Sequence, residues 1–398
     1  MIPFRSLVLL NVFLSFSLSF TFQANAQSSS HAVLRGQLDH SRIKFQLEKR
    51  GSVAFIGGSI TEMNGYRPMV MEYLQQRFPE TEFTFTNAGI SSTCSTTGAF
   101  RFQRDVISVK PDLLFVEFAV NDDQDAAHSA RDCVRGMEGI IRHARTNNPN
   151  IDIVMTHFVN PSMLQKAQEG KQATSVAQHE RVADHYQVSS VNVPGELADQ
   201  IKSGNMTWER FGGTHPKDPG NRMVADKIIE TLDAAWKTNL PDDATAKPHR
   251  LPEPLDTNSY FQGRLVHVDQ AKLDDDWMIK TPDWKSLPGG KRDRFNELKL
   301  LCATRADATL ILDFTGKAIG AFVLAGPDAG QLDYSIDGSP FKTVDLYHRY
   351  SKGLHYPRTV MFDADLSDSP HQLALRVSKS RNAGSQGTAA RIMEFVVN

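Results

Sequence analysis

The sequence predicts a three-layer α/β domain built on a parallel sheet, followed by a smaller all-β sandwich domain. Residues 52–236 alternate short apolar runs with longer amphipathic stretches, and beyond residue 263 the hydrophobic period changes to two. Apolar strands separated by helical periods are typical of a parallel sheet covered on both faces. Short alternating strands without helices between them are typical of a sandwich. The length of 398 residues also favours two domains over one.

The start of the chain predicts a secretory signal peptide. It contains one basic residue, Arg5, then a long apolar stretch, and ends on the small-x-small sequence Ala24-Asn25-Ala26. We expect cleavage after Ala26, which removes residues 1–26 and leaves an exported protein, periplasmic or extracellular, without a membrane partner. An uncleaved anchor is the alternative, because the apolar run is nearly long enough to span a bilayer.

The first domain, residues 27–237, contains five apolar runs that predict strands and four amphipathic segments that predict helices. The strands are VAFIGG, EFTFTNAG, DLLFVEFAV, IDIVMTHFV and VSSVNV, and the helices cover residues 67–78, 130–146, 163–186 and 221–236. Loops that leave the carboxyl ends of parallel strands line the ligand crevice. We therefore expect Ser59, residues 87–94 and Asn121 on one rim.

The second half begins with a change of composition. Prolines and charges replace periodicity over residues 238–263, which predicts a linker. Residues 264–398 then contain several short alternating runs, and Asp337-Gly338 between two of them predicts a hairpin turn. We expect these strands to form the β-sandwich.

The composition excludes some classes of partner. The net charge is −2 and the pI is about 6.7, so neither nucleic acid nor an anionic membrane surface is an expected partner. Three scattered cysteines, Cys94, Cys133 and Cys302, lack the spacing of a metal or redox site, and we expect buried thiols. The sequence predicts no metal and no cofactor.

The segment FIGGSIT, at the end of the first strand, allows three interpretations. It can be a plain turn, a phosphate-binding loop, or a turn that presents a nucleophile. Gly57 and Gly58 permit a tight turn and leave Ser59 accessible. The phosphate loop is excluded because the GKS or GKT ending of such a loop is absent.

Three later segments favour the nucleophile. NAG and AVND end the next two strands, where the Gly89 N–H and the Asn121 amide can donate to a tetrahedral oxyanion. THP places His215 in a loop before the last helix of the domain, where it can accept the proton of Ser59 and return it to the leaving group.

These segments, GGSIT, NAG, AVND and THP, resemble the four blocks of the SGNH (GDSL-type) hydrolase superfamily. The resemblance implies a flavodoxin-like α/β/α fold and hydrolysis of acyl esters through a serine acyl-enzyme. It also implies Ser59 as the nucleophile and His215 as the base. The oxyanion donors that it implies are the N–H of Ser59, Gly89 and Asn121.

The sequence departs from the superfamily pattern in three places. GGS replaces GDS, Ala119 replaces a glycine, and Gly212 occupies the position of the acid three residues before the histidine. Glu209 and Asp218 are candidates for a third triad member, although Asp-Pro at a helix start also fits an N-cap. A backbone carbonyl can instead hold His215, which leaves a Ser-His dyad.

Other residues of this domain have structural interpretations. His157 either lines the pocket or packs, and Glu117 in a buried strand needs a partner, so we expect it to support the structure. Arg101 and Arg104 are expected in surface ion pairs, with substrate contact as the alternative. No base is predicted beside Cys94, which argues against a thiol mechanism.

We expect an exported serine esterase that removes small acyl groups, acetyl groups of carbohydrate above all, from a small-molecule or polysaccharide substrate. The expectation of a carbohydrate substrate is based on the predicted export, on the second domain, and on a third block, FVEFAVND, which is similar to that of bacterial carbohydrate esterases. A catalytically decayed glycan-binding or scaffold protein is the alternative, because the usual acid is missing at Gly212.

Overall fold

The computed structural model describes residues 1, 31–36 and 38–398. The predicted signal peptide therefore lies outside the described residues, apart from Met1. The chain divides into two compact units, and the account below concerns the second unit, His31–Asn398. Within its described part, no helix has the length and apolar character needed to cross a membrane.

The first domain contains a six-stranded sheet in the order β1-β6-β5-β4-β2-β3. All neighbouring strands are parallel except β1, which pairs antiparallel with β6 at one edge. The bounds are β1 (Ala32–Val33), β2 (Arg50–Gly57), β3 (Glu82–Gly89), β4 (Leu113–Glu117), β5 (Asp152–His157) and β6 (Ser189–Asn192). The five predicted strands are confirmed, and the two-residue β1 is too short to give a periodic signal.

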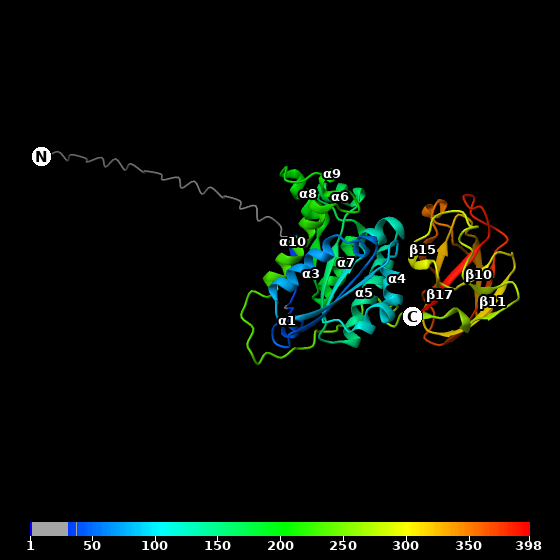
Figure 1. Cartoon of the computed structure of the whole chain (residues 1–398), viewed down its shortest axis with the longest axis horizontal. Helices are drawn as coiled ribbons and strands as arrows, with labels where there is room; N and C mark the ends of the chain where they lie inside the picture. Colours follow the sequence, from blue (N-terminus) through cyan, green and yellow to red (C-terminus); the bar gives the residue numbers. More distant parts are fainter. Residues whose placement is uncertain (2–30, 37) are drawn as a thin grey trace. The chain divides into compact units, whose positions relative to one another are not determined.

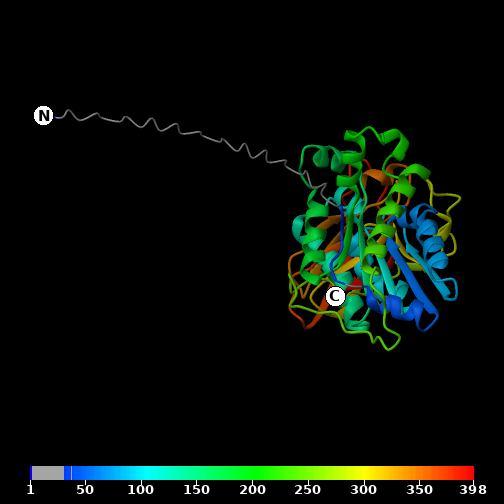
Figure 2. The ribbon, with the colours of Figure 1, turned by 90° about the vertical axis from the view of Figure 1, so that its left-hand side faces the viewer.

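Helices cover both faces of this sheet, as predicted. An apolar core joins one face to α1 (Asp39–Gln46), α3 (Tyr66–Arg77) and α10 (Asp218–Ala235), and a second core joins the other face to α4 (Ser95–Asp105) and α5 (Ala130–Asn147). Figure 1 shows α3 and α10 on the opposite side of the sheet from α4 and α5, and Figure 2 views the domain from the side of α3 and α10.

One predicted helix is wrong in its extent. Residues 163–186 form two helices, α6 (Pro161–Gln168) and α7 (Thr174–Tyr186), followed after β6 by α8 (Val193–Lys202). The break contains Gly170 at φ +72°, a left-handed conformation that ends a helix. The periodicity continues across this break, which is why the sequence predicted a single helix.

The second domain consists of two antiparallel sheets, as the alternating runs predict. One has the order β15-β12-β17-β10-β9 with β7 also paired to β17, and the other has the order β14-β13-β16-β11-β8. Asp337 and Gly338 both have positive φ, 52° and 75°, which confirms the hairpin turn between β13 and β14. The bounds are β7 (Arg264–Val266), β8 (Lys272–Leu273), β9 (Met278–Lys280), β10 (Leu300–Ala303), β11 (Thr309–Thr315), β12 (Ile319–Ala325), β13 (Gln331–Ile336), β14 (Lys342–Asp345), β15 (Tyr356–Asp363), β16 (Pro370–Val377) and β17 (Ala390–Val397).

Residues 238–263 contain no helix or strand, but their second half is packed on the first domain. The buried Glu138 of α5 accepts hydrogen bonds from the N–H groups of Leu255 and Asp256 and from the Ser259 hydroxyl. Ser259 and Tyr260 are buried. The end of this connection is therefore fixed to α5 rather than free.

The two domains share one apolar core. The cluster that covers the α4–α5 face of the parallel sheet also includes Leu300, Phe322 and Met393 of the second domain. A separate cluster lies between the two antiparallel sheets. The second domain therefore buries one of its faces against the helices of the first.

Candidate active site

Ser59 lies at the carboxyl end of β2, on the first turn of a short helix, α2 (Ser59–Glu62). Both preceding glycines are required by close contacts. A Cβ atom on Gly57 would lie 2.2 Å from Thr61 Oγ1, and one on Gly58 would lie 2.1 Å from Asn121 Oδ1. The turn therefore brings Ser59 next to the end of β4, where Asn121 lies.

His215 meets Ser59 across 156 residues of sequence. Its Nε2 atom lies 2.7 Å from Ser59 Oγ, a hydrogen-bond distance. His215 lies in the loop between α9 (Trp208–Phe211) and α10, where the side-chain amide of Asn221 donates to the carbonyl of Pro216 at 2.7 Å. The structure thus brings together the predicted nucleophile and the predicted base.

Among the described residues, no carboxylate contacts His215 by a hydrogen bond or ion pair. Gly212 has φ +106°, and a Cβ atom there would lie 2.2 Å from the backbone nitrogen of Lys217. Glu209 on α9 is exposed, and within residues 38–398 neither Glu209 nor Asp218 forms a hydrogen bond or ion pair with His215. The structure therefore holds a Ser-His pair without the predicted third member.

Asp218 also departs from its predicted structural role. It is the first residue of α10, and the N-cap position belongs to Lys217. No side chain forms a capping hydrogen bond at this helix end. The helix begins one residue earlier than Asp-Pro predicts, with Pro219 still in its first turn.

Gly89 is not a free oxyanion donor, which corrects the prediction. Its N–H donates to Asn87 Oδ1 at 2.9 Å. The residue must be glycine for another reason, because a Cβ atom would lie 2.4 Å from the backbone nitrogen of Glu62. The glycine therefore allows β3 to approach α2 closely.

Asn121 is buried beside Gly58, and one N–H of its side-chain amide is engaged. Nδ2 donates to Asp125 Oδ2 at 2.6 Å, and Oδ1 has no hydrogen-bond partner in the described structure. Burial raises the pKa of Asp125, whereas the hydrogen bond from Asn121 lowers it. The NH2 group has two N–H donors, and the second has no acceptor among the described residues, so Asn121 can donate to an oxyanion while it keeps this bond.

Ser92, in the loop after β3, was missed as a donor by the sequence analysis. Its φ is +72°, and among the described contacts its N–H has no acceptor. The N–H groups of Ile90, Ser91 and Thr93 are all hydrogen-bonded. A left-handed serine leaves no signature in the sequence, so only the structure reveals this free donor.

Comparison with known proteins identifies the first domain. The profile of the GDSL-like Lipase/Acylhydrolase family matches residues 55–223, a range that contains both Ser59 and His215. These residues belong to the GDSL-like lipase/acylhydrolase family. No curated protein matches the chain in sequence.

The whole chain, including the second domain, has a counterpart among solved structures. A two-domain esterase (CEX) active on acetylated mannans, co-crystallized with mannopentaose, is 20% identical and superposes with a TM-score of 0.74. The match covers 92% of this chain and 96% of that chain. A second structure of CEX gives the same TM-score and identity and is covered over 97% of its length. The chain therefore shares the two-domain fold of that esterase.

Glu117 supports the nucleophile turn of the GDSL-like domain, as predicted. It is fully buried, and its Oε2 atom accepts from the Gly58 N–H at 3.3 Å and from Thr61 Oγ1 at 3.1 Å. Its Oε1 atom has no partner among the described residues. Burial raises the pKa of Glu117 to about 7, and these two hydrogen bonds only partly oppose the shift.

Arg101 is a buried structural residue of the GDSL-like domain rather than the predicted surface partner. Its guanidinium donates to the carbonyls of Ala88 at 2.6 Å and Gly57 at 3.1 Å, at the ends of β3 and β2. It also pairs with Asp105 at 2.9 Å. Arg104 does form the expected exposed pair with Asp105, at 2.6 Å.

His157 packs rather than lining an open pocket. It is 1% exposed, and its Nε2 atom lies 2.9 Å from Glu180. The buried His179 next to it pairs with Asp122 at 2.9 Å. Both histidines therefore belong to the buried network behind the rim.

Cys94 has an imidazole beside it, contrary to the prediction. The ligand atoms of Cys94, Asp122 and His128 lie within 4.8 Å of one another. Burial raises the pKa of the Cys94 thiol, but His128 outweighs burial and leaves it lowered. All three cysteines are free and buried, as expected.

The same cluster has the residue types of a metal site, but its carboxylate is engaged. Asp122 accepts from the N–H of Ser95 at 2.8 Å and from its hydroxyl at 2.6 Å, in addition to His179. Asp122 thereby caps the start of α4. Its contacts identify it as a structural carboxylate of the GDSL-like domain.

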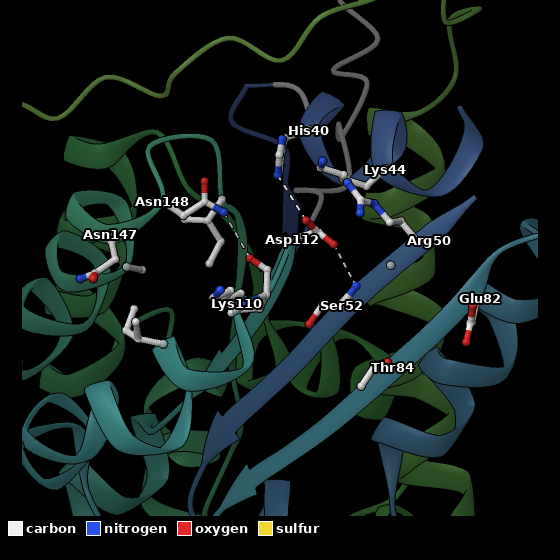
Figure 3. A pocket seen from close by; sticks show the side chains of 15 residues that line it. His40, Lys44, Arg50, Ser52, Glu82, Thr84, Lys110, Asp112, Asn147 and Asn148 are labelled. Atoms are coloured by element: carbon white, nitrogen blue, oxygen red, sulfur yellow. Dashed lines mark hydrogen bonds and ion pairs between the residues drawn. The ribbon is translucent and has the colours of Figure 1, made fainter. Parts of the chain in front are cut away.

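A cavity of about 780 Å³ lies at the opposite end of the sheet from Ser59. Figure 3 shows its lining side chains around the amino ends of β2 and β3, including His40, Arg50 and Asp112. His40 lies 3.5 Å from Asp112, which accepts from the N–H of Ser52 at 2.9 Å. This cavity contains neither Ser59 nor His215 and is separate from the candidate active site.

Proposed function

We propose that this chain is an exported serine esterase that removes small acyl groups, acetyl above all, from carbohydrate. The observation that carries the proposal is the 2.7 Å contact between Ser59 Oγ and His215 Nε2 at the carboxyl edge of the sheet. Membership of residues 55–223 in an acylhydrolase family supports the ester chemistry.

In the proposed reaction, Ser59 Oγ attacks the ester carbonyl while His215 Nε2 accepts its proton. The tetrahedral intermediate then collapses, and the leaving oxygen of the sugar takes that proton from His215 and departs as a hydroxyl. Water, deprotonated by His215, attacks the acyl-enzyme. His215 then returns the proton to Ser59 Oγ as the acyl C–O bond breaks and the acid is released. The two steps need no redox partner, and every proton passes through His215.

The developing oxyanion needs donors that are already oriented. The N–H of Ser59 and the N–H of Ser92 have no acceptors among the described residues. Ser59 begins α2 after β2, and Ser92 lies in the loop after β3, both at the carboxyl edge of the sheet. The second N–H of Asn121 Nδ2 can act as a third donor while the first stays bonded to Asp125. Because no carboxylate of residues 31–36 and 38–398 contacts His215, these donors matter more than in a full triad.

The carbohydrate part of the proposal rests on three supports. They are the predicted export, the appended β domain, and the shared fold with a two-domain esterase that is active on acetylated mannans. A panel of acetylated polysaccharides, assayed by acetate release, tests it. Release from none of them, by a protein that hydrolyses aryl acetates, would restrict the function to other esters.

The alternative is a glycan-binding protein whose catalytic site has decayed, and the missing acid at Gly212 favours it. Aryl-acetate turnover by purified protein distinguishes the two, with Ser59→Ala as the control. We expect turnover that the substitution abolishes. Equal rates in the two proteins would support the binding protein.

A further inference from the structure

The loop that carries Ser92 is held by side chains of the second domain. Arg292 Nη2 donates to Ser92 Oγ at 2.8 Å, and the Tyr356 hydroxyl donates to the carbonyl of Ser92 at 3.2 Å. Arg294 Nη1 donates to the carbonyl of Gly89 at 3.1 Å and pairs with Glu62 at 2.6 Å. The loop of one domain is therefore fixed from the other.

These contacts act on a residue in an unfavourable conformation. A φ of +72° is rare for any residue with a side chain, because Cβ crowds the backbone. Such conformations persist where surrounding contacts over-determine them, and they gather at functional sites. Arg292 holds the side chain of Ser92 and Tyr356 holds its carbonyl, so both ends of the residue are fixed.

The surroundings of the two contacts are well packed. Tyr356 is 3% exposed. Arg292 is half-buried, and its Nη1 atom is buried without a hydrogen-bond partner in the described structure. Moving either side chain would therefore cost packing as well as a hydrogen bond. The pair makes a stiff support for the loop.

We propose that Arg292 and Tyr356 are positioning residues: they keep Ser92 left-handed, so that its N–H stays free as an oxyanion donor for the Ser59 reaction. The second domain then contributes to turnover and not only to substrate binding. This inference rests on the proposed function, because an oxyanion forms only if Ser59 attacks an ester. It predicts a loss in kcat, with KM little changed.

The unpaired Nη1 atom of Arg292 offers a competing role, direct contact with substrate. The two roles are separated by the side chain at position 92. Ser92→Ala removes the hydroxyl but keeps the Cβ crowding, whereas Ser92→Gly removes both and leaves φ > 0 without cost. A positioning role is rescued by the glycine substitution and not by the alanine one, whereas a substrate contact is rescued by neither.

The experiment measures kcat and KM for an aryl acetate, which carries no sugar. We expect Arg292→Met and Tyr356→Phe each to lower kcat about fivefold to tenfold, because the left-handed serine loses a support. Arg292→Met combined with Ser92→Gly should recover most of that loss, and Arg292→Met combined with Ser92→Ala should not. The matched control is Arg305→Met, which removes an exposed ion pair with Asp276 in the same domain.

The outcomes are distinguishable. The inference would be overturned if the variant that combines Arg292→Met with Ser92→Gly were as slow as the variant that combines Arg292→Met with Ser92→Ala. A rise in KM without a fall in kcat in the single variants would also overturn it. Wild-type protein no faster than Ser59→Ala would instead overturn the proposed function and the inference with it. Urea unfolding of every variant identifies any whose slow turnover comes from a destabilised fold.

Discussion

Two residues at the site show how backbone conformation limits what a side chain can do. Gly212 stands where the superfamily resemblance places an acid, but its φ of +106° and the nearby Lys217 nitrogen leave no room for a Cβ atom. Ser92 is the opposite case, because it has a left-handed φ of +72° and nevertheless carries a side chain. Neither fact follows from residue type or spacing, since dihedral angles depend on tertiary contacts.

The Gly212 conformation predicts that a triad cannot be restored by substitution. Gly212→Asp should lower the free energy of unfolding by about 2–4 kcal/mol through strain and overlap, and should not raise kcat. Gly213→Asp is the control, because Gly213 also has positive φ, 89°, but a Cβ atom there has no neighbour within 4 Å. Urea unfolding of both variants checks this. A faster, equally stable Gly212→Asp enzyme would contradict it.

Glu117 predicts a stability that depends on pH. Its pKa is raised from 4.5 to about 7 by burial, so the folded protein binds the proton more tightly than the unfolded chain. The resulting stabilisation is complete below about pH 4.5 and is lost as the pH rises through 7. Between pH 5 and pH 8 the loss should be about 2–3 kcal/mol.

Urea unfolding of Glu117→Gln at both pH values checks this. The variant should lack the pH-dependent loss, because its amide does not titrate. Glu209→Gln, at an exposed position, should keep the wild-type dependence. An identical pH dependence in wild type and Glu117→Gln would show that the carboxyl does not titrate in this range.

At the scale of elements, strand ends determine where the site forms. β2 and β4 end beside each other, which brings Ser59 and Asn121 to one rim, as predicted from the parallel sheet. Three of the five predicted strands, β2, β4 and β5, were accessible to sequence reasoning because buried parallel strands are nearly continuous apolar runs. The edge strand β3 instead alternates polar and apolar residues. α4 was missed because it begins with small polar residues and a glycine, and its start is capped by the distant Asp122.

The contact between Ser59 and His215 was predictable because each residue lies in a short motif directly after or before a strong element. The oxyanion donor that we propose at Ser92 was not. Gly89 seemed suited to that role by its place at the end of β3, but its N–H bonds Asn87 within the same motif. The free N–H belongs to Ser92, whose conformation depends on residues about two hundred positions later.

The buried hydrogen bonds of Arg101 join α4 to the ends of β2 and β3, and we expect them to stabilise the fold. Arg101→Met removes two buried hydrogen bonds to the ends of β2 and β3 and should cost about 2–4 kcal/mol of stability. Arg104→Met, which removes only a half-exposed pair, should cost less than about 1 kcal/mol. Urea unfolding of both variants measures this difference, because the midpoint reports stability where the m-value is unchanged. Equal midpoints would show that the buried contacts do not stabilise the fold.

At the scale of the whole molecule, the shared apolar core predicts that both domains unfold together. Trp208 and Trp236 report on the first domain, and Trp277 and Trp284 on the second. Replacing either pair by phenylalanine leaves the fluorescence of one domain. We expect the fluorescence transition of each variant to coincide with the unfolding of the whole protein, measured on the same variant by circular dichroism. A fluorescence transition well separated from the circular dichroism transition would indicate that the domains unfold independently.

The attachment of Ser92 to Arg292 and Tyr356 has a consequence for protein engineering. An appended domain that is joined only by a flexible linker can be exchanged for another without loss of catalysis. Here a chimera that replaces residues 264–398 must supply an apolar face for α4 and α5 and also hydrogen-bond donors to the loop after β3. Recombination between relatives should therefore preserve turnover only when both halves come from the same parent or when these contacts are transplanted with them.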